Sequence, residues 1–131
     1  MFIDASVLSA MMTDEEEARA FAIRMQPATA RMTSPLAAAR AAIEISTILG
    51  LSPTESAEAV RAFLQLMNIQ ILAVPPRVAF LAAEAYERYG EGGRAGRLSL
   101  DDCMTYACAH YYRQPLLSKS GRFNQTDIEM A

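Results

Sequence analysis

The chain has 131 residues, of which 52% are hydrophobic and 21% are charged, a composition typical of one globular domain. Its formal net charge is −3 at pH 7, which argues against a general binder of polyanions. The apolar-rich residues 35–51 include Arg40 and Glu44, and no secretory signal pattern opens the chain. We therefore expect a single domain over residues 1–131 that does not enter a membrane.

The N-terminal residues Met1, Phe2 and Ile3 form a short apolar run that ends at Asp4, followed by Ser6. Such a run is typical of a strand buried on both faces of a parallel sheet. Asp4 then lies where the strand ends and the next helix begins, and ligands bind at that edge of open α/β sheets. We expect the strand to be central and Asp4 to belong to a functional site.

Helices and short strands alternate along the rest of the chain. We expect helices at residues 18–26, 36–49, 53–67, 78–89 and 99–112. We expect strands at residues 31–34, 69–74 and 116–118, and a last small strand around 127–128. The alternation predicts βαβ crossovers. The expected fold is therefore α/β and three-layered, with a central, mostly parallel sheet of four to five short strands flanked by helices on both faces.

Several helix starts carry specific signals. Ser52, Pro53 and Glu55 combine a capping serine, a proline at the first position and a glutamate three residues after the serine. The acidic residues 14–17 favour a helix start because carboxylates in a first turn oppose the helix dipole. The glycine-rich residues 90–96 predict a loop that is too irregular to cradle a phosphate.

Two cysteines, Cys103 and Cys108, lie five residues apart on a predicted helix. This spacing points their side chains about 140° apart, which disfavours a disulfide bond between them. Reduced thiols are typical of the cytoplasm. We therefore expect a cytoplasmic protein.

A second acidic pair, Asp101 and Asp102, follows Ser99 at a predicted helix start. Acidic residues in a first helical turn stabilise the helix by about 0.3–1 kcal/mol through its dipole. This capping effect needs only one of the two aspartates. Because the next residues are apolar enough to bury the helix against the sheet, one aspartate should face inward. We expect Asp102 to approach Asp4.

Two carboxylates about 5 Å apart repel each other by roughly 3 kcal/mol at an effective dielectric constant near 20. Neither Asp4 nor Asp102 has a lysine or arginine beside it in the sequence, so a divalent cation is the expected counter-charge. Oxygen ligands without a His–Cys cluster favour Mg²⁺, with Mn²⁺ as a substitute. Such sites activate water and stabilise charge on a phosphoryl group.

Four segments together resemble the VapC-type toxins, PIN-domain proteins of bacterial toxin–antitoxin pairs. They are residues 1–6, 33–36, 98–107 and 115–128, in the family's order and with suitable spacing. The resemblance implies a PIN-like domain and a Mg²⁺-dependent endoribonuclease with three or four clustered acidic residues. It also implies a homodimer, an RNA substrate and a small cognate antitoxin whose tail enters the acidic groove.

Matched residue by residue, the resemblance assigns Asp4 and Asp102 as metal ligands. Two further acidic positions of the family are altered here. One falls on Arg40, which reverses the charge, and the other falls on Gly121 or Arg122. The sequence alone leaves open whether these changes preserve, weaken or abolish activity.

Substitutes for the altered positions lie nearby. Glu44 follows Arg40 by one helical turn and is a candidate catalytic residue, and Asp101 and Asp127 are candidate helpers. Arg40 has two alternative roles, pairing with Asp4 or Asp102 in place of the metal or binding an RNA phosphate. The basic candidates for phosphate contact are Arg40, Lys119 and Arg122.

Two main functions follow from these patterns. The first is a Mg²⁺-dependent endoribonuclease toxin of a type II toxin–antitoxin pair. The second is a catalytically degenerate PIN fold retained to bind an antitoxin or another partner. A metabolic α/β enzyme with a nucleotide cofactor fits less well, because the chain lacks a glycine-rich turn between a strand and a helix.

Overall fold

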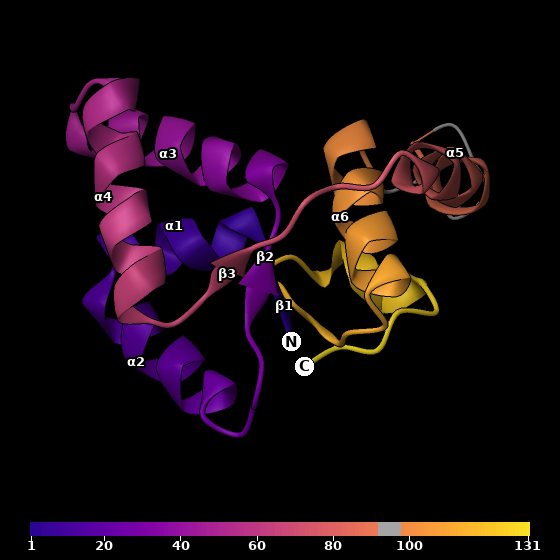
Figure 1. The fold of residues 1–131 in the computed structure, drawn as a ribbon, viewed down its shortest axis with the longest axis horizontal. Helices are drawn as coiled ribbons and strands as arrows, with labels where there is room; N and C mark the ends of the chain where they lie inside the picture. Colours follow the sequence, from indigo (N-terminus) through magenta and orange to yellow (C-terminus); the bar gives the residue numbers. More distant parts are fainter. Residues whose placement is uncertain (92–97) are drawn as a thin grey trace.

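The structure is a computed structural model that describes residues 1–91 and 98–131. Its four short strands form one parallel sheet in the order β3-β2-β1-β4 (Figure 1). The strands are β1 (Phe2–Ile3), β2 (Met32–Thr33), β3 (Gln70–Ile71) and β4 (Leu116–Leu117). The N-terminal strand β1 thus lies inside the sheet, as expected from its apolar sequence. Most of the loop expected at residues 90–96 falls on residues 92–97, outside the described part.

Six α-helices and one 3-10 turn surround this sheet in the described residues. They are α1 (Ala5–Thr13), α2 (Glu15–Met25), α3 (Pro35–Leu49), α4 (Pro53–Leu66), α5 (Arg77–Tyr89), α6 (Leu100–Tyr111) and the turn η1 (Gly121–Gln125). Serine caps begin three of the α-helices, since Ser34, Ser52 and Ser99 accept backbone N–H groups at the starts of α3, α4 and α6. The sequence predicted that a helix follows Asp4 but gave no residue range for it, and the structure shows this helix as α1.

The central sheet has a separate hydrophobic core on each face. Successive residues of a strand point to opposite faces, so Ile3 packs among residues of α1–α4 while Phe2 packs among residues of α5 and α6. Leu117 and Leu116 of the neighbouring strand β4 divide between the two cores in the same way. Figure 1 shows α1–α4 on one side of the sheet and α5 and α6 on the other. The expected three-layer α/β arrangement is confirmed.

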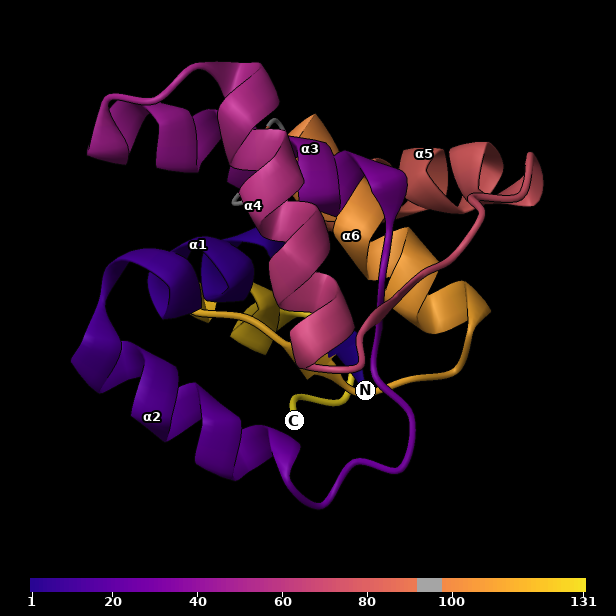
Figure 2. The same cartoon turned by 60° about the vertical axis from the view of Figure 1, so that its left-hand side comes forward.

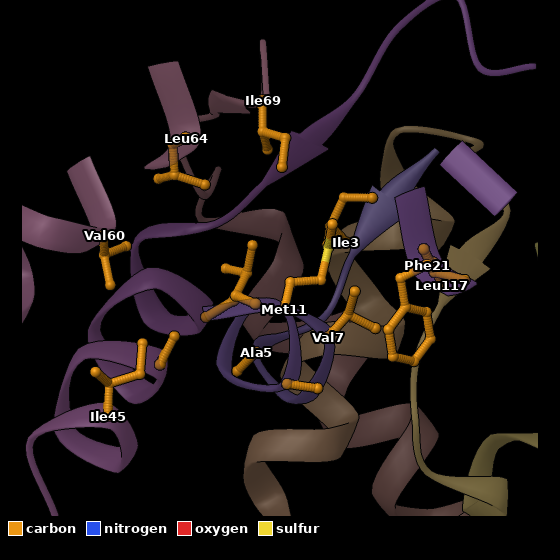
Figure 3. Packing of buried hydrophobic residues seen from close by; sticks show 14 of the residues in the cluster. Ile3, Ala5, Val7, Met11, Phe21, Ile45, Val60, Leu64, Ile69 and Leu117 are labelled. Atoms are coloured by element: carbon orange, nitrogen blue, oxygen red, sulfur yellow. The ribbon is translucent and has the colours of Figure 1, made fainter. Parts of the chain in front are cut away.

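The larger core lies beneath α1–α4. Met11 from α1, Phe21 from α2 and Ile45 from α3 meet Ile3 there (Figure 3). α4 packs along α3 (Figure 2) and contributes Leu64 to the same core. This packing fixes the carboxyl end of β1 relative to α1 and α3.

Two strand predictions need correction. The strand expected at residues 69–74 is reduced to β3, because only Gln70 and Ile71 pair with β2 before the chain leaves the sheet toward α5. Both residues are exposed, as befits an edge strand. The strand expected around 127–128 is replaced by a single bridge between Met130 and Leu116, since η1 delays the return of the chain to the sheet.

No single helix in the described residues has the length and hydropathy of a membrane span. α3 and α4 meet those criteria only when they are taken together, and the two are bent by 118° at their junction.

Gly90 closes α5 where the chain lies against Tyr86. A Cβ atom at this position would clash with the Tyr86 carbonyl oxygen and lie 2.7 Å from its ring Cγ. We predict that Gly90→Ala lowers the free energy of unfolding by about 1–3 kcal/mol, because backbone and ring must both shift. Urea denaturation measures this change.

Gly121→Ala is the matched control, since its Cβ would meet Asn124 Nδ2 at an ordinary 3.7 Å. We expect the control to change the unfolding free energy by less than about 0.5 kcal/mol. Equal stability of the two variants would contradict the packing described at Gly90.

Candidate functional site

Asp4 lies at the carboxyl end of β1 and is the N-cap residue of α1. Its side chain makes no capping hydrogen bond. It instead accepts hydrogen bonds from hydroxyl groups on three separate segments of the chain. Ser6 Oγ and Ser118 Oγ donate to Oδ2 at 2.6 Å and 3.0 Å, and Thr105 Oγ1 donates to Oδ1 at 3.4 Å. The chain therefore holds this carboxylate in a fixed orientation with neutral donors.

Asp102 lies in the first turn of α6 and forms a capping box with Ser99. Its Oδ2 accepts the Ser99 backbone N–H at 3.0 Å, and the Ser99 hydroxyl accepts the Asp102 N–H at 3.2 Å. The Asp102 side chain is only 8% exposed, whereas that of Asp101 is 44% exposed. The prediction that Asp102 is the aspartate facing inward is confirmed.

Thr105 connects the two aspartates. It follows Asp102 by three residues on α6, and residues at this spacing are neighbours on one helix face. Because Thr105 also donates to Asp4, the helix that bears Asp102 contacts Asp4 directly. Residues from the two ends of the chain thus meet at the carboxyl ends of β1 and β4.

Arg40 of α3 contacts the outward aspartate of this pair. Its Nη1 lies 2.7 Å from Asp101 Oδ2, and its Nη2 lies 3.7 Å from Glu44 Oε1. Ser9 of α1 donates to the other oxygen of Glu44 at 2.7 Å. The alternative in which Arg40 pairs with Asp4 or Asp102 is therefore wrong, since the more exposed Asp101 is the carboxylate that α3 faces.

Arg122, predicted only as a phosphate contact, forms an ion pair with Asp102 that sequence reasoning missed. Its Nη2 lies 3.3 Å from Asp102 Oδ1, although the two residues are twenty positions apart in different elements. Local sequence around Asp102 holds no basic residue, so the expected unbalanced pair of carboxylates is partly balanced through the fold. The departure from the family pattern at Gly121 or Arg122 was the signal available in the sequence.

Two other candidates have partners of their own. Asp127 accepts a hydrogen bond from the Tyr106 hydroxyl and lies 3.9 Å from Arg88 Nη2. Lys119 Nζ lies 2.8 Å from Glu17 Oε1 on α2. Asp127 is thus tied to α5 and α6, and Lys119 to α2, in place of direct contacts with Asp4 or Asp102.

The donor set of the site suits a hard cation. Within the described residues, no group of three His, Cys, Asp or Glu side chains forms a complete metal cluster. Mg²⁺, however, is usually bound through one or two carboxylates with waters completing the shell. The carboxylates of Asp4, Asp101, Asp102 and Glu44 and the guanidinium groups of Arg40 and Arg122 sum to a net charge of −2, which one divalent cation balances. Asp4 and Asp102 therefore fit Mg²⁺.

The thiols of Cys103 and Cys108 are buried on α6 and stay protonated at neutral pH. Burial raises the pKa of Cys103 to about 11, and the neighbouring carboxylate of Asp102 acts in the same direction. Burial also raises the pKa of Cys108 to about 11. Both cysteines are free, so they contribute apolar packing rather than thiolate ligands.

Comparisons with known proteins give a consistent result. A family profile described as a PIN domain matches residues 1–129. The chain is 31% identical over 128 residues to VapC ribonuclease Mb0640 of Mycobacterium bovis, covering 98% of this chain and 95% of that protein. It is 32% identical over 128 residues to a ribonuclease VapC of Mycolicibacterium smegmatis, covering 98% and 97% respectively.

The fold has a solved counterpart. The crystal structure of VapC20 of Mycobacterium tuberculosis, described as a toxin that cleaves the sarcin-ricin loop, superposes with a TM-score of 0.74. The match covers 99% of this chain and 97% of that one at 17% identity, which establishes a shared fold.

The contacts of Asp127 lead to a test of pH dependence. The hydrogen bond from Tyr106 holds the pKa of Asp127 below its ordinary value of 3.8, with partial burial opposing it and Arg88 assisting. A lowered pKa in the folded state adds stability above the ordinary pKa, and that stability is lost as the pH falls through the folded-state pKa. We predict that Tyr106→Phe lowers the unfolding free energy at pH 7 by about 1 kcal/mol. The expected change is small because the Asp127 side chain is half exposed.

The difference in unfolding free energy between Tyr106→Phe and the unchanged protein should shrink as the pH falls below the ordinary aspartate pKa. The reason is that Asp127 in the unchanged protein then becomes protonated and is no longer a charged acceptor. Urea denaturation of both proteins over a pH series measures it. Tyr111→Phe, at a more exposed position on the same helix, serves as the control. A deficit that stays constant into the acid range would contradict the assigned hydrogen bond.

Proposed function

Because the chain belongs to the PIN-domain family, and within it to the VapC proteins, we propose that it is a Mg²⁺-dependent endoribonuclease toxin of a type II toxin–antitoxin pair. The observation that carries the proposal is the contact of Asp4 with α6, the helix whose first turn bears Asp102. Thr105 of α6 donates to Asp4 just after the carboxyl end of β1. That edge is the usual ligand-binding position in an open α/β sheet.

Asp4 and Asp102 hold the cation in this proposal, with Mn²⁺ able to replace Mg²⁺. The chemistry supplied by such a bound cation is activation of water and charge stabilisation at the phosphoryl group. Ser6, Ser118 and Thr105 orient the Asp4 carboxylate through their hydroxyl groups. These positioning contacts reduce the entropy lost when the site takes up its ligands.

Basic residues at the rim contact the RNA backbone. Arg40 is 41% exposed, so it can leave Glu44 and Asp101 to bind a phosphate with its forked guanidinium. Glu44 is then free to orient the attacking water, a role that needs a positioned acceptor. The same proposal assigns phosphate contacts to Lys119 and Arg122, and supporting roles to Asp101 and Asp127.

The proposal extends to partners and location. We propose that residues 1–131 act as a single PIN-like domain that forms a homodimer in the cytoplasm. A small cognate antitoxin inhibits the protein by presenting basic side chains to the acidic site. Arginine suits this contact because its planar fork matches a carboxylate.

The metal-site assignment predicts the effect of removing either carboxylate charge. Asp4→Asn and Asp102→Asn should each lower the rate of RNA cleavage in Mg²⁺ by about a hundredfold or more, since the cation and the activated water are lost together. Cleavage of a fluorescent oligoribonucleotide with and without Mg²⁺ measures the rate. Glu58→Gln, an exposed carboxylate on α4, is the control and should cleave like the unchanged protein. Equal rates in all four proteins would reject the assignment.

Two ion pairs at the site favour a second function. Arg40 pairs with Asp101 and Arg122 pairs with Asp102, and the two positions where the family resemblance implies acids fall on Arg40 and on Gly121 or Arg122. In this alternative the site is catalytically degenerate, and the fold is retained to bind an antitoxin or another partner. The two functions differ in whether the remaining carboxylates sustain turnover.

Restoring an acid at position 40 separates the two functions. If the natural site is attenuated, Arg40→Glu should raise Mg²⁺-dependent RNA cleavage by about tenfold or more, because a third carboxylate joins the site and a competing cation is removed. The same oligoribonucleotide assay applies, with Arg19→Glu on the exposed face of α2 as the matched charge reversal. An unchanged cleavage rate in Arg40→Glu would instead favour a site that is already complete with Asp4, Asp102 and Glu44.

A further inference from the structure

The two oxygens of the Asp102 carboxylate have different partners. Oδ2 accepts the backbone N–H of Ser99 within the capping box of α6. Oδ1 faces the Arg122 guanidinium at 3.3 Å. Oδ1 is therefore the oxygen of Asp102 that takes no part in the helix cap, and Arg122 lies beside it.

The contacts of Arg122 hold its backbone more firmly than its side chain. Its backbone N–H donates to Ser120 Oγ at 3.2 Å, and the next residue, Phe123, is fully buried in the core beneath α5 and α6. The Arg122 side chain, in contrast, is 52% exposed and reaches Asp102 through one guanidinium nitrogen. A half-exposed ion pair with a single long contact contributes little to stability.

Arg40 differs from Arg122 in this respect. It contacts Asp101 at 2.7 Å and Glu44 at 3.7 Å, so its charge is already shared between two carboxylates outside the Asp102 contact. Among the basic residues that the structure describes, Arg122 is therefore the one that contacts the buried aspartate.

We propose that Arg122 is a displaceable counter-ion that competes with a divalent cation for Asp102 Oδ1. This inference rests on the proposed metal site and adds its regulation. With no cation bound, the guanidinium balances the charge of a carboxylate that burial would otherwise leave without one. A divalent cation displaces Arg122, and the released guanidinium then faces the RNA backbone as a phosphate ligand.

Calorimetric titration of the full chain with Mn²⁺ tests the proposal. Arg122→Gln removes the competing charge and keeps a polar side chain of similar length. Because competition and binding are linked thermodynamically, this variant should bind Mn²⁺ about fivefold or more tightly than the unchanged protein. Arg61→Gln is the matched control, since Arg61 pairs only at the surface with Glu58 on α4, and it should leave the affinity unchanged.

A double variant shows where the competition occurs. In the Asp102→Asn background, Arg122→Gln should no longer raise the Mn²⁺ affinity, since the contested oxygen has lost its charge. An equal or weaker affinity of Arg122→Gln, no Mn²⁺ binding by that variant, or the same gain in the Asp102→Asn background would each overturn the proposal.

The titration is independent of catalysis. Tighter Mn²⁺ binding by Arg122→Gln, combined with no RNA cleavage by the unchanged protein, would refute the proposed nuclease function and still support competition at Asp102. RNA cleavage that depends on Asp4 and Asp102, combined with unchanged Mn²⁺ affinity in Arg122→Gln, would refute the competition alone.

Discussion

Compensation of the buried charge on Asp102 is the constraint on which the site depends. A carboxylate that is 8% exposed is costly unless its oxygens find donors or a cation. The helix cap satisfies one oxygen, and Arg122 satisfies the other. The same residue thus caps α6 and is the ligand that we propose for the cation, so its two oxygens must be considered separately.

The position of Asp4 is a simple consequence of strand geometry. Phe2 and Ile3 anchor β1 in two different cores, so a slip by one residue would move each side chain into the core on the other face. Asp4 follows directly and meets hydroxyl groups from α1, α6 and the end of β4. The rigid part of the molecule therefore presents a carboxylate already oriented by neutral donors.

Sequence patterns predicted the parts of this arrangement that are local. The apolar run before Asp4, the capping signals at Ser52 and Ser99, and the inward position of Asp102 each depend on residues within a few positions. The contact between Arg122 and Asp102 joins segments twenty residues apart, and local periodicity carries no signal for it. The strand expected at residues 69–74 failed for a similar reason, since pairing with β2 decides where β3 ends.

The most direct test of the account is the crystal structure of the protein grown with Mn²⁺ and measured at a wavelength where manganese scatters anomalously. We predict one anomalous peak bonded to Asp4 and to Oδ1 of Asp102, with the Arg122 guanidinium turned away from that oxygen. A peak that touches neither aspartate, or an Arg122 that still contacts Asp102 beside a bound cation, would contradict the account.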